Sequence, residues 1–379
     1  MPFTGKATYS AGATLPEIVE DLSDLVGLAA AQETPLLDAL GDSTRVARST
    51  VHEWLEDAPR PTGVSALSAV SATVFTVSDA TALAVGDVIQ LGDTAEMALV
   101  TAVSTGDARV TLARGYGGTP TSAYGDWSTM TVVSSPALEG GDARAARFTN
   151  RVRVSNTTQI FSATVEVSGT QQAVSLAGVR DEIDYQKTLR LRELTRDLER
   201  AIIQGVAPTA HVEGNATTAR SMRGILSYLT TNVLAPDDLV AGATSLTEAV
   251  LNAALRSVWE RGIGTPDLIV VNGREKRHIN EFLASNRRFA PSEESFRNLV
   301  SVYESDYGVC RVVLSRHVPV GKALLLDSSR VAVVPLAGRS FHYKALAATG
   351  DREAGQIIGE YTLELRNEAA HGVIDGLAA

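Results

Sequence analysis

The stretch TLARGYGGTP, residues 111–120, has the glycine density of a loop that cradles the phosphates of a nucleotide. Gly115 and Gly117 have the spacing that begins a dinucleotide-binding fingerprint, but Pro120 stands where the third glycine belongs, and no helix is predicted to follow. Without a helix N-terminus, a phosphate would lack the positive end of a helix dipole. We therefore expect a turn after a strand, with Gly117 and Gly118 supplying positive φ angles.

The residues that could form a metal site or supply a catalytic thiol also lack the partners that such sites need. His52 and Glu53 begin the His-Glu-x-x-His pattern of zinc proteases, but Glu56 replaces the second histidine. Cys310 is the single cysteine, which excludes an intrachain disulfide and a cysteine-built zinc site. It alternates inward with Val312 and Leu314 on the predicted strand VCRVVLS, residues 309–315, which indicates a small buried hydrophobe. The sequence therefore predicts no catalytic residue, no metal and no cofactor, and we expect a protein that is not an enzyme.

The overall charge also limits the function classes. The chain of 379 residues carries 44 acidic and 34 basic residues, a net charge of −10. A protein that grips nucleic acid through phosphates normally shows a basic patch, and the sequence indicates none. No apolar run approaches the roughly 20 residues of a membrane span, so we expect no membrane association.

Two kinds of segment precede residue 136. Apolar residues recur at 3, 4 and 7 spacing in residues 15–26, which predicts a one-faced helix closed near Gly27. The following residues up to 60 lack such periodicity, and we expect an extended arm that lies on another surface. Short alternating runs separated by turn residues then predict a compact all-β module over residues 64–135. Its strands are expected at residues 73–77, 87–91, 97–103, 109–113 and 129–133.

The second half of the chain begins with a ribbon and a long helix. RFTNRVRVSNTTQIFSATVEVSG, residues 147–169, alternates along much of its length and predicts a two-sided ribbon that other chains or its own pairing must stabilise. Residues 178–205 predict the strongest helix, with one apolar stripe and surface charge pairs at i,i+3 that include Arg196 with Glu199. Helices and strands alternate after it, so the predicted class is α+β or α/β.

The order of these segments resembles that of the HK97-like major capsid proteins of tailed bacteriophages, in a branch with a β-rich insertion in the E-loop. The segments that carry the resemblance are EDLSDLVGLAAAQETPLLDAL with HEWLED, VFTVSDATALAVGDVIQLG through VTLARGYGGT, ARSMRGILSYLTTN, PDLIVVNGREKRHINEF and LAATGDREAGQIIGEYTLELRNEAAHGVI. The resemblance implies an α+β HK97-like capsid fold, with an N-arm, an E-loop, a P-domain with a long spine helix, an A-domain and an inserted all-β module.

The resemblance also implies a division of the chain. The ranges are 1–60 for the N-terminal arm, 61–175 for the E-loop region with the inserted module at 64–135, 176–222 for the P-domain with the spine helix at 178–205, 223–339 for the A-domain, 340–368 for the long P-domain strand, and 369–379 for the C-terminal return to the A-domain.

The function that the resemblance implies is that of a shell tile. Copies of the chain would form hexamers and pentamers of an icosahedral shell, assembled in the host cytoplasm, that becomes the virion capsid around double-stranded DNA. An acidic chain suits a container that confines DNA without binding its sequence. The implied partners are other copies of the chain, a portal and, in some members, a decoration protein. Because the arm pattern begins by Leu15, we expect a separate scaffolding protein.

Residues of the arm and of the arginine-rich region are the candidates for contacts between subunits. They are Trp54, Arg144, Arg147, Arg151, Arg153, Arg180 and Glu182. Some members of the family crosslink a lysine to an asparagine of the neighbouring subunit. This chain has no lysine between Lys6 and Lys187, so we expect a shell that is held together noncovalently.

Three alternatives stay open on the sequence alone. An encapsulin-like nanocompartment shares the fold and would enclose a cargo protein. A cytosolic enzyme could assemble its site from remote residues. A phage tail or adhesin component could bind glycans through Tyr116, Tyr124 and Trp127 of the β-rich module, although these aromatic residues also suit the core and rim of such a module.

Overall fold

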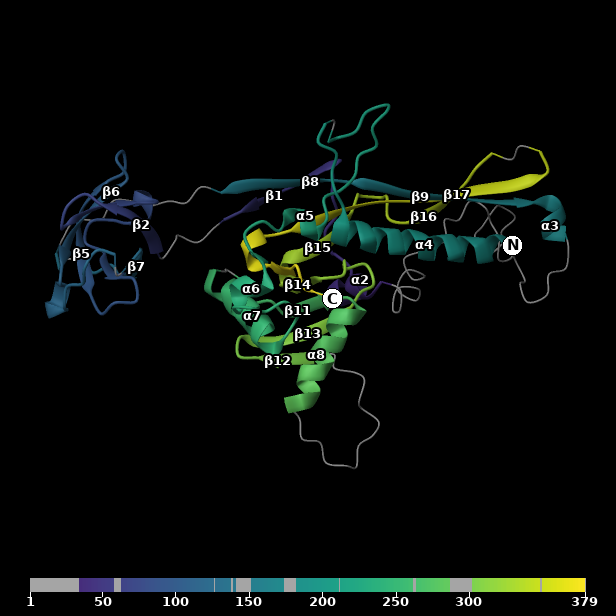
Figure 1. Ribbon diagram of the computed structural model, residues 1–379. Coiled ribbons are helices and arrows are strands. Elements are labelled where there is room, and N and C mark those ends of the chain that lie inside the picture. The colour runs from purple at the N-terminus through teal and green to yellow at the C-terminus, as the bar shows by residue number, and fades with distance from the viewer. Residues whose placement is uncertain are drawn as a thin grey trace, which may run out of the picture. The chain divides into compact units, whose positions relative to one another are not determined.

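The computed structural model describes residues 34–57, 63–125, 127–137, 139–140, 151–173, 182–210, 212–261, 264–286, 302–347 and 350–378. The chain divides into two compact units, one of residues 57–151 and one that combines residues 1–56 with 152–379 (Figure 1). Both helices and strands contribute, which confirms the mixed α/β class. The predicted helix over residues 15–26 lies outside the described residues.

The unit of residues 57–151 contains a closed barrel of six strands in the order β2-β3-β6-β5-β4-β7. Val, Phe, Ile and Leu residues that alternate along these strands fill its interior, and Phe75, Ile89 and Met130 are fully buried. The strands are β2 (Gly63–Ala69), β3 (Val74–Val77), β4 (Val88–Leu91), β5 (Met97–Ser104), β6 (Arg109–Arg114) and β7 (Thr129–Ser134), with short 3-10 turns η1 (Ala80–Ala82) and η2 (Tyr116–Gly118).

The glycines of residues 111–120 form the turn that leaves β6. Gly115, Gly117 and Gly118 have φ angles of 66°, 68° and 80°, so the predicted left-handed conformation of Gly117 and Gly118 is confirmed. A side chain at any of the three would strain the backbone. The turn contains the three-residue η2 and is followed by extended chain, so no helix of phosphate-binding length begins there.

The larger unit contains two sheets and a two-stranded ribbon. A six-stranded sheet has the order β10-β18-β14-β11-β13-β12, and its central strand β11 (Leu268–Val271) is buried at every residue. The second sheet is built on β17 (Arg352–Leu365), which pairs with β15 and β16 and, along ten residue pairs, with β9 (Gln159–Ser168). The ribbon consists of β1 (Val51–Glu56) and β8 (Val152–Thr157).

The remaining elements cover and connect these sheets. They are α2 (Pro35–Leu40), α3 (Gly169–Ala173), α4 (Glu182–Gln204), α5 (Ile225–Tyr228), β10 (Val233–Leu234), α6 (Pro236–Leu239), α7 (Glu248–Arg261), α8 (Gly273–Asn286), β12 (Val302–Ser305), β13 (Gly308–Leu314), β14 (Lys322–Leu326), η4 (Ser328–Arg330), β15 (Val331–Pro335), β16 (His342–Ala345), η5 (Glu368–Ala370) and β18 (Gly372–Asp375).

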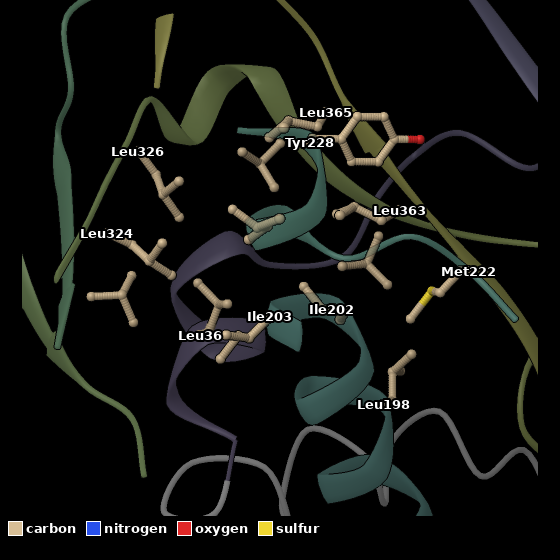
Figure 2. Close-up of a cluster of buried hydrophobic side chains, with 14 of the residues drawn as sticks. Leu36, Leu198, Ile202, Ile203, Met222, Tyr228, Leu324, Leu326, Leu363 and Leu365 are labelled. Atoms are coloured by element: carbon tan, nitrogen blue, oxygen red, sulfur yellow. The ribbon is translucent and has the colours of Figure 1, made fainter. Parts of the chain in front are cut away.

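The long helix predicted over residues 178–205 is observed as α4, Glu182–Gln204, and residues 178–181 lie outside the described part. It lies along β9 and β17 (Figure 1). Leu198, Ile202 and Ile203 of its apolar stripe enter a core that β14, β17 and α2 complete (Figure 2). The helix therefore joins the two sheets through one continuous apolar cluster.

The segment predicted as an extended arm contains a short helix and a strand in the part that the structure describes, residues 34–57. Residues 35–40 form helix α2, whose Leu36 is fully buried against Ile203 in the core (Figure 2). Residues 51–56 pair with β8 of the same chain. Helix α2 and strand β1 therefore attach this segment to the larger unit, while most of residues 41–50 between them are exposed.

Candidate assembly surfaces

Cys310, the single cysteine, occupies a structural position. It is 1% exposed, and its Sγ donates a hydrogen bond of 3.2 Å to the carbonyl oxygen of Pro266. Burial, with the charge of Asp267, raises the pKa of its thiol to about 11, as expected of a buried hydrophobe. Leu314, expected to point inward with it, is instead 51% exposed.

The part of the chain that the structure describes shows neither a metal-binding cluster nor a membrane span. It contains no group of three or more His, Cys, Asp or Glu side chains that could hold a metal ion. Among the same residues, no helix is both long enough and apolar enough to cross a membrane.

A buried carboxylate on β17 anchors the ribbon of β1 and β8. Glu364 is 2% exposed, and its two oxygens lie 2.8 Å from His52 Nε2 on β1 and 2.8 Å from Arg45 Nη1. Arg366 contacts the same carboxylate. Burial opposes the ionisation of Glu364, but the hydrogen bond from His52 and the charge of Arg366 outweigh it and lower its pKa. The base of the ribbon is therefore tied to the central strand by charged hydrogen bonds.

A second buried carboxylate on β17 also anchors the ribbon. It belongs to Glu360, which lies four residues before Glu364. Glu360 accepts hydrogen bonds from Thr158 Oγ1 at 2.6 Å and from Arg220, and Arg339 Nε lies 2.8 Å from its other oxygen. Burial opposes its ionisation, but the hydrogen bonds from Thr158 and Arg220 outweigh it and lower its pKa. Thr158 joins β8 to β9, so this network fixes the point at which the ribbon leaves the sheet.

The free end of the ribbon exposes apolar side chains. Leu55 on β1 and Val152 on β8 are 61% and 60% exposed, although aliphatic side chains of this size gain free energy when buried. Beside them Glu53 and Arg153 form an exposed ion pair of 3.4 Å, worth little in water. At the same end Glu56 accepts a hydrogen bond of 2.8 Å from the backbone N–H of Asn367, so the end is attached to the larger unit but incompletely covered.

The predicted contact residues other than Trp54 fall into three groups. Arg153 lies on the exposed ribbon end, and Arg151 closely precedes it and is exposed. Glu182 begins α4 and accepts a hydrogen bond of 2.8 Å from Gln186 within the helix. Arg144, Arg147 and Arg180 lie outside the described residues.

Trp54 is committed mainly to its own chain. It is 7% exposed, its ring centroid lies 6.3 Å from that of Tyr228, and its Nε1 donates to Glu56 Oε1 at 2.7 Å. Its immediate neighbour Leu55, which the sequence interpretation leaves out, carries the exposed apolar surface. Alternation along residues 51–56 is the available signal, because Trp54 and Leu55 must point to opposite faces of the strand.

The sequence interpretation also misses the buried carboxylates of β17. Glu360, Thr362 and Glu364 alternate with Tyr361, Leu363 and Leu365, which is typical of a strand with one solvated face. In the structure both faces are buried, because the ribbon and residues 220–223 cover the polar one. Their basic partners lie as far as 140 and 319 residues away in sequence, beyond the reach of any local pattern.

Comparison with protein families gives a match along nearly the whole chain. The family model described as SU10 major capsid protein matches residues 3–378. Among curated proteins, none matches.

Several solved structures are similar at low identity. A cyanophage A-1(L) capsid structure is 13% identical with a TM-score of 0.46, covering 65% of this chain and 85% of that chain. A chain of Mycobacterium phage Adephagia is 11% identical with a TM-score of 0.44, covering 98% of both chains. The SrpI encapsulin complex of Synechococcus elongatus PCC 7942 is 13% identical with a TM-score of 0.43, covering 60% of this chain and 78% of that chain. Because these TM-scores lie below 0.5, the assignment of the chain rests on the family model.

Proposed function

The chain belongs to the SU10 major capsid protein family, and from this membership we propose that its copies form hexamers and pentamers of an icosahedral shell around double-stranded DNA. The ribbon of β1 and β8 would supply a principal contact between neighbouring subunits. The shell would assemble in the host cytoplasm with a separate scaffolding protein and a portal.

The shell proposal is carried by the family membership, and the proposed ribbon contact is supported by the apolar side chains exposed at the ribbon end. The base of the ribbon is bound to β17 through Glu360 and Glu364, whereas its end exposes Leu55 and Val152. A two-stranded ribbon is marginal by itself. Leu55 pairs with Arg153 and Val152 pairs with Glu56, so the two apolar side chains lie on opposite faces, and burying both requires neighbouring chains on both faces of the ribbon end. At about 2 kcal/mol for each buried aliphatic side chain, repetition over many copies supplies substantial assembly free energy.

We also propose how the elements correspond to the parts of an HK97-like capsid protein. Residues up to 60 are the N-terminal arm, and β1, β8 and β9 belong to the E-loop region of residues 61–175 or pair with it. The barrel of β2 to β7 is the module inserted in that region. Helix α4 is the spine helix, the six-stranded sheet forms the A-domain, and β17 is the long P-domain strand.

The test is a double variant of the ribbon end, Leu55→Asp with Val152→Asp. Both residues are exposed in the isolated chain, so the variant should fold, and its unfolding midpoint should match that of the parent. Placing two carboxylates in a subunit interface should abolish assembly, which sedimentation through a sucrose gradient and electron microscopy would report.

A matched control places the same two charges on another surface. Val309→Asp with Val320→Asp changes residues that are 58% and 71% exposed, far from the ribbon in sequence. Shell formation by the ribbon variant at parental yield would contradict the proposed contact. Nuclease-protected DNA in purified particles would separate a genome container from an encapsulin-like shell, which would hold a cargo protein instead.

A further inference from the structure

A row of arginines runs along the exposed side of α4. Arg192, Arg196 and Arg200 are spaced at i, i+4 and i+8, which places them on one side of the helix at intervals of about 6 Å along its axis. Arg192 and Arg200 are exposed, and Arg196 is half-buried. We call these three residues, together with Arg316, the arginine strip.

The fold fixes Arg316 beside this row. Ser315 Oγ donates a hydrogen bond of 2.6 Å to Glu199 Oε1, and Gln204 of α4 donates to the carbonyl oxygen of His317. The loop that carries Arg316 is therefore attached at both of its flanking residues to the last turns of α4. Burial lowers the pKa of His317, and the positive charges of Arg200, Arg316 and Arg196 lower it further. These three guanidinium groups therefore all lie near His317.

Three of the four arginines of the strip, Arg192, Arg200 and Arg316, are poorly neutralised, whereas Arg196 takes part in an interaction of its own. In the described part of the chain, Arg192 and Arg316 have no hydrogen bond or ion pair. Arg200 has a 3.4 Å contact with Asp197 in which both side chains are more than half exposed, so it contributes little.

Two other carboxylates of α4 near the strip in sequence are committed elsewhere. Glu193 pairs with Arg190, and Glu199 is turned into the core, where it binds Ser315 and the backbone of α2. A chain with a net charge of −10 thus carries one surface where guanidinium groups gather with few opposing carboxylates.

We propose that the arginine strip binds the phosphate backbone of nucleic acid. Planar guanidinium groups bind phosphate oxygens through paired N–H donors, and contacts to phosphates are independent of base sequence. The inference rests on the proposed function in one respect. If the shell encloses DNA, the side of α4 that carries the arginine strip faces that DNA. It also amends the sequence interpretation, which finds no basic patch, because Arg316 joins the other three only in the folded chain.

The salt dependence of binding gives the proposal a magnitude. Four phosphate contacts predict that the logarithm of the binding constant falls with the logarithm of salt concentration at a slope of about −3.6. Between about 50 and 200 mM salt, affinity should therefore fall about 150-fold. With three of the contacts removed, the slope should be about −0.9 and the loss only about 3.5-fold.

The experiment measures binding of the unassembled full-length chain to a short fluorescent DNA duplex of mixed sequence, by anisotropy at several salt concentrations. The variant replaces Arg192, Arg196 and Arg200 by glutamine. The control makes the same charge change elsewhere, as Arg256→Gln, Arg277→Gln and Arg352→Gln, at exposed arginines that each pair with a carboxylate. We expect the strip variant to lose binding and most of the salt slope, and the control to keep both.

Three results would overturn the proposal. They are absence of binding by the parent chain at the lowest salt, equal binding by the strip variant and the parent, and binding of polyglutamate through the strip in preference to DNA, which would indicate an acidic polypeptide partner. Electron microscopy of the same preparations tests the proposed function separately. Shells that form without any DNA binding would refute only the role of the strip, and DNA binding without shells would refute only the container.

Discussion

Replacing Glu96 by glutamine should destabilise the six-stranded barrel by about 3 kcal/mol at neutral pH. Glu96 is fully buried just before β5, and its carboxylate accepts hydrogen bonds from Arg114 Nε and Nη2 at 2.8 and 2.6 Å. It also accepts from the backbone N–H and the Oγ of Ser122, at 2.6 and 2.7 Å. This one side chain therefore holds the residues that follow the glycine-rich turn against β6.

The magnitude follows from the ionisation of Glu96. Burial opposes the charged form, but the hydrogen bonds from Arg114 and Ser122 outweigh it and lower the pKa from 4.5 to about 2. A difference of about 2.5 pH units at 1.36 kcal/mol per unit gives about 3.4 kcal/mol. Because the pKa is lower in the folded state, this stabilisation is present above about pH 4.5 and is lost as the pH falls toward about 2. Near about pH 3, about 1.4 kcal/mol of it should be left.

The assay uses Trp127, the single tryptophan between residues 57 and 151. With Trp54 and Trp259 replaced by phenylalanine in both proteins, urea unfolding followed by fluorescence reports on the barrel alone. The difference in unfolding free energy between the parent and the Glu96→Gln variant should be about 3 kcal/mol at neutral pH. It should shrink by about 2 kcal/mol near pH 3.

Two outcomes would refute this reasoning. A difference below about 1 kcal/mol at neutral pH would mean that the ionised carboxylate contributes no more than an ordinary hydrogen bond. A difference that is the same under acidic and neutral conditions would mean that its ionisation is not linked to folding.

Two further predictions concern packing and the chemistry of the shell. Gly224→Ala should destabilise the larger unit by about 1–3 kcal/mol, because a Cβ there would lie 2.5 Å from the backbone nitrogen of Gly205. Thermal unfolding would measure this loss of stability. The control is Gly106→Ala, whose added Cβ would meet no atom within 4 Å. Particles boiled in SDS with reducing agent should give a single band at the 40.0 kDa of one chain, and a ladder of resistant oligomers would contradict a noncovalent shell.

Regular elements with a strong local pattern can be predicted from the sequence. The predicted start of helix α4, residue 178, lies four residues before the first residue that the structure describes as helical. The predicted and observed bounds agree this well because the apolar stripe spans many turns. The five strands predicted in the all-β module agree within about a residue with β3 to β7, because alternation and turn residues mark each of them, whereas β2 is not predicted. That β2 closes the sheet by pairing with both β3 and β7 cannot be predicted, since strand partners are not encoded in periodicity.

Contacts between distant segments account for the failures. The pairing expected between Arg196 and Glu199 is wrong, because Glu199 is buried and its Oε2 accepts the backbone N–H of Leu36 at 3.1 Å. The same contact explains why residues 35–40 form a helix where none is predicted: six residues are too few to show periodicity, and the carboxylate satisfies free N–H groups at the helix start. Both errors arise from one long-range interaction that no sequence window contains.

The exposed surface of the ribbon can be predicted only in part, because it too depends on contacts between distant segments. The sequence points to residues 147–169 as unusual, since an alternating two-sided strand has little to bury by itself, but it predicts no strand at residues 51–56. The size of Trp54 favours it as the contact residue. The fold of residues 222–229 covers that side chain and leaves Leu55 exposed, and this choice between faces depends on tertiary packing.

Electron microscopy of the purified, full-length protein tests the central claim most directly. A member of the SU10 major capsid protein family whose subunits assemble through the ribbon should give capsomers or closed icosahedral shells under at least one assembly condition, with or without a co-expressed scaffolding protein. A well-behaved monomer under every such condition would contradict the account.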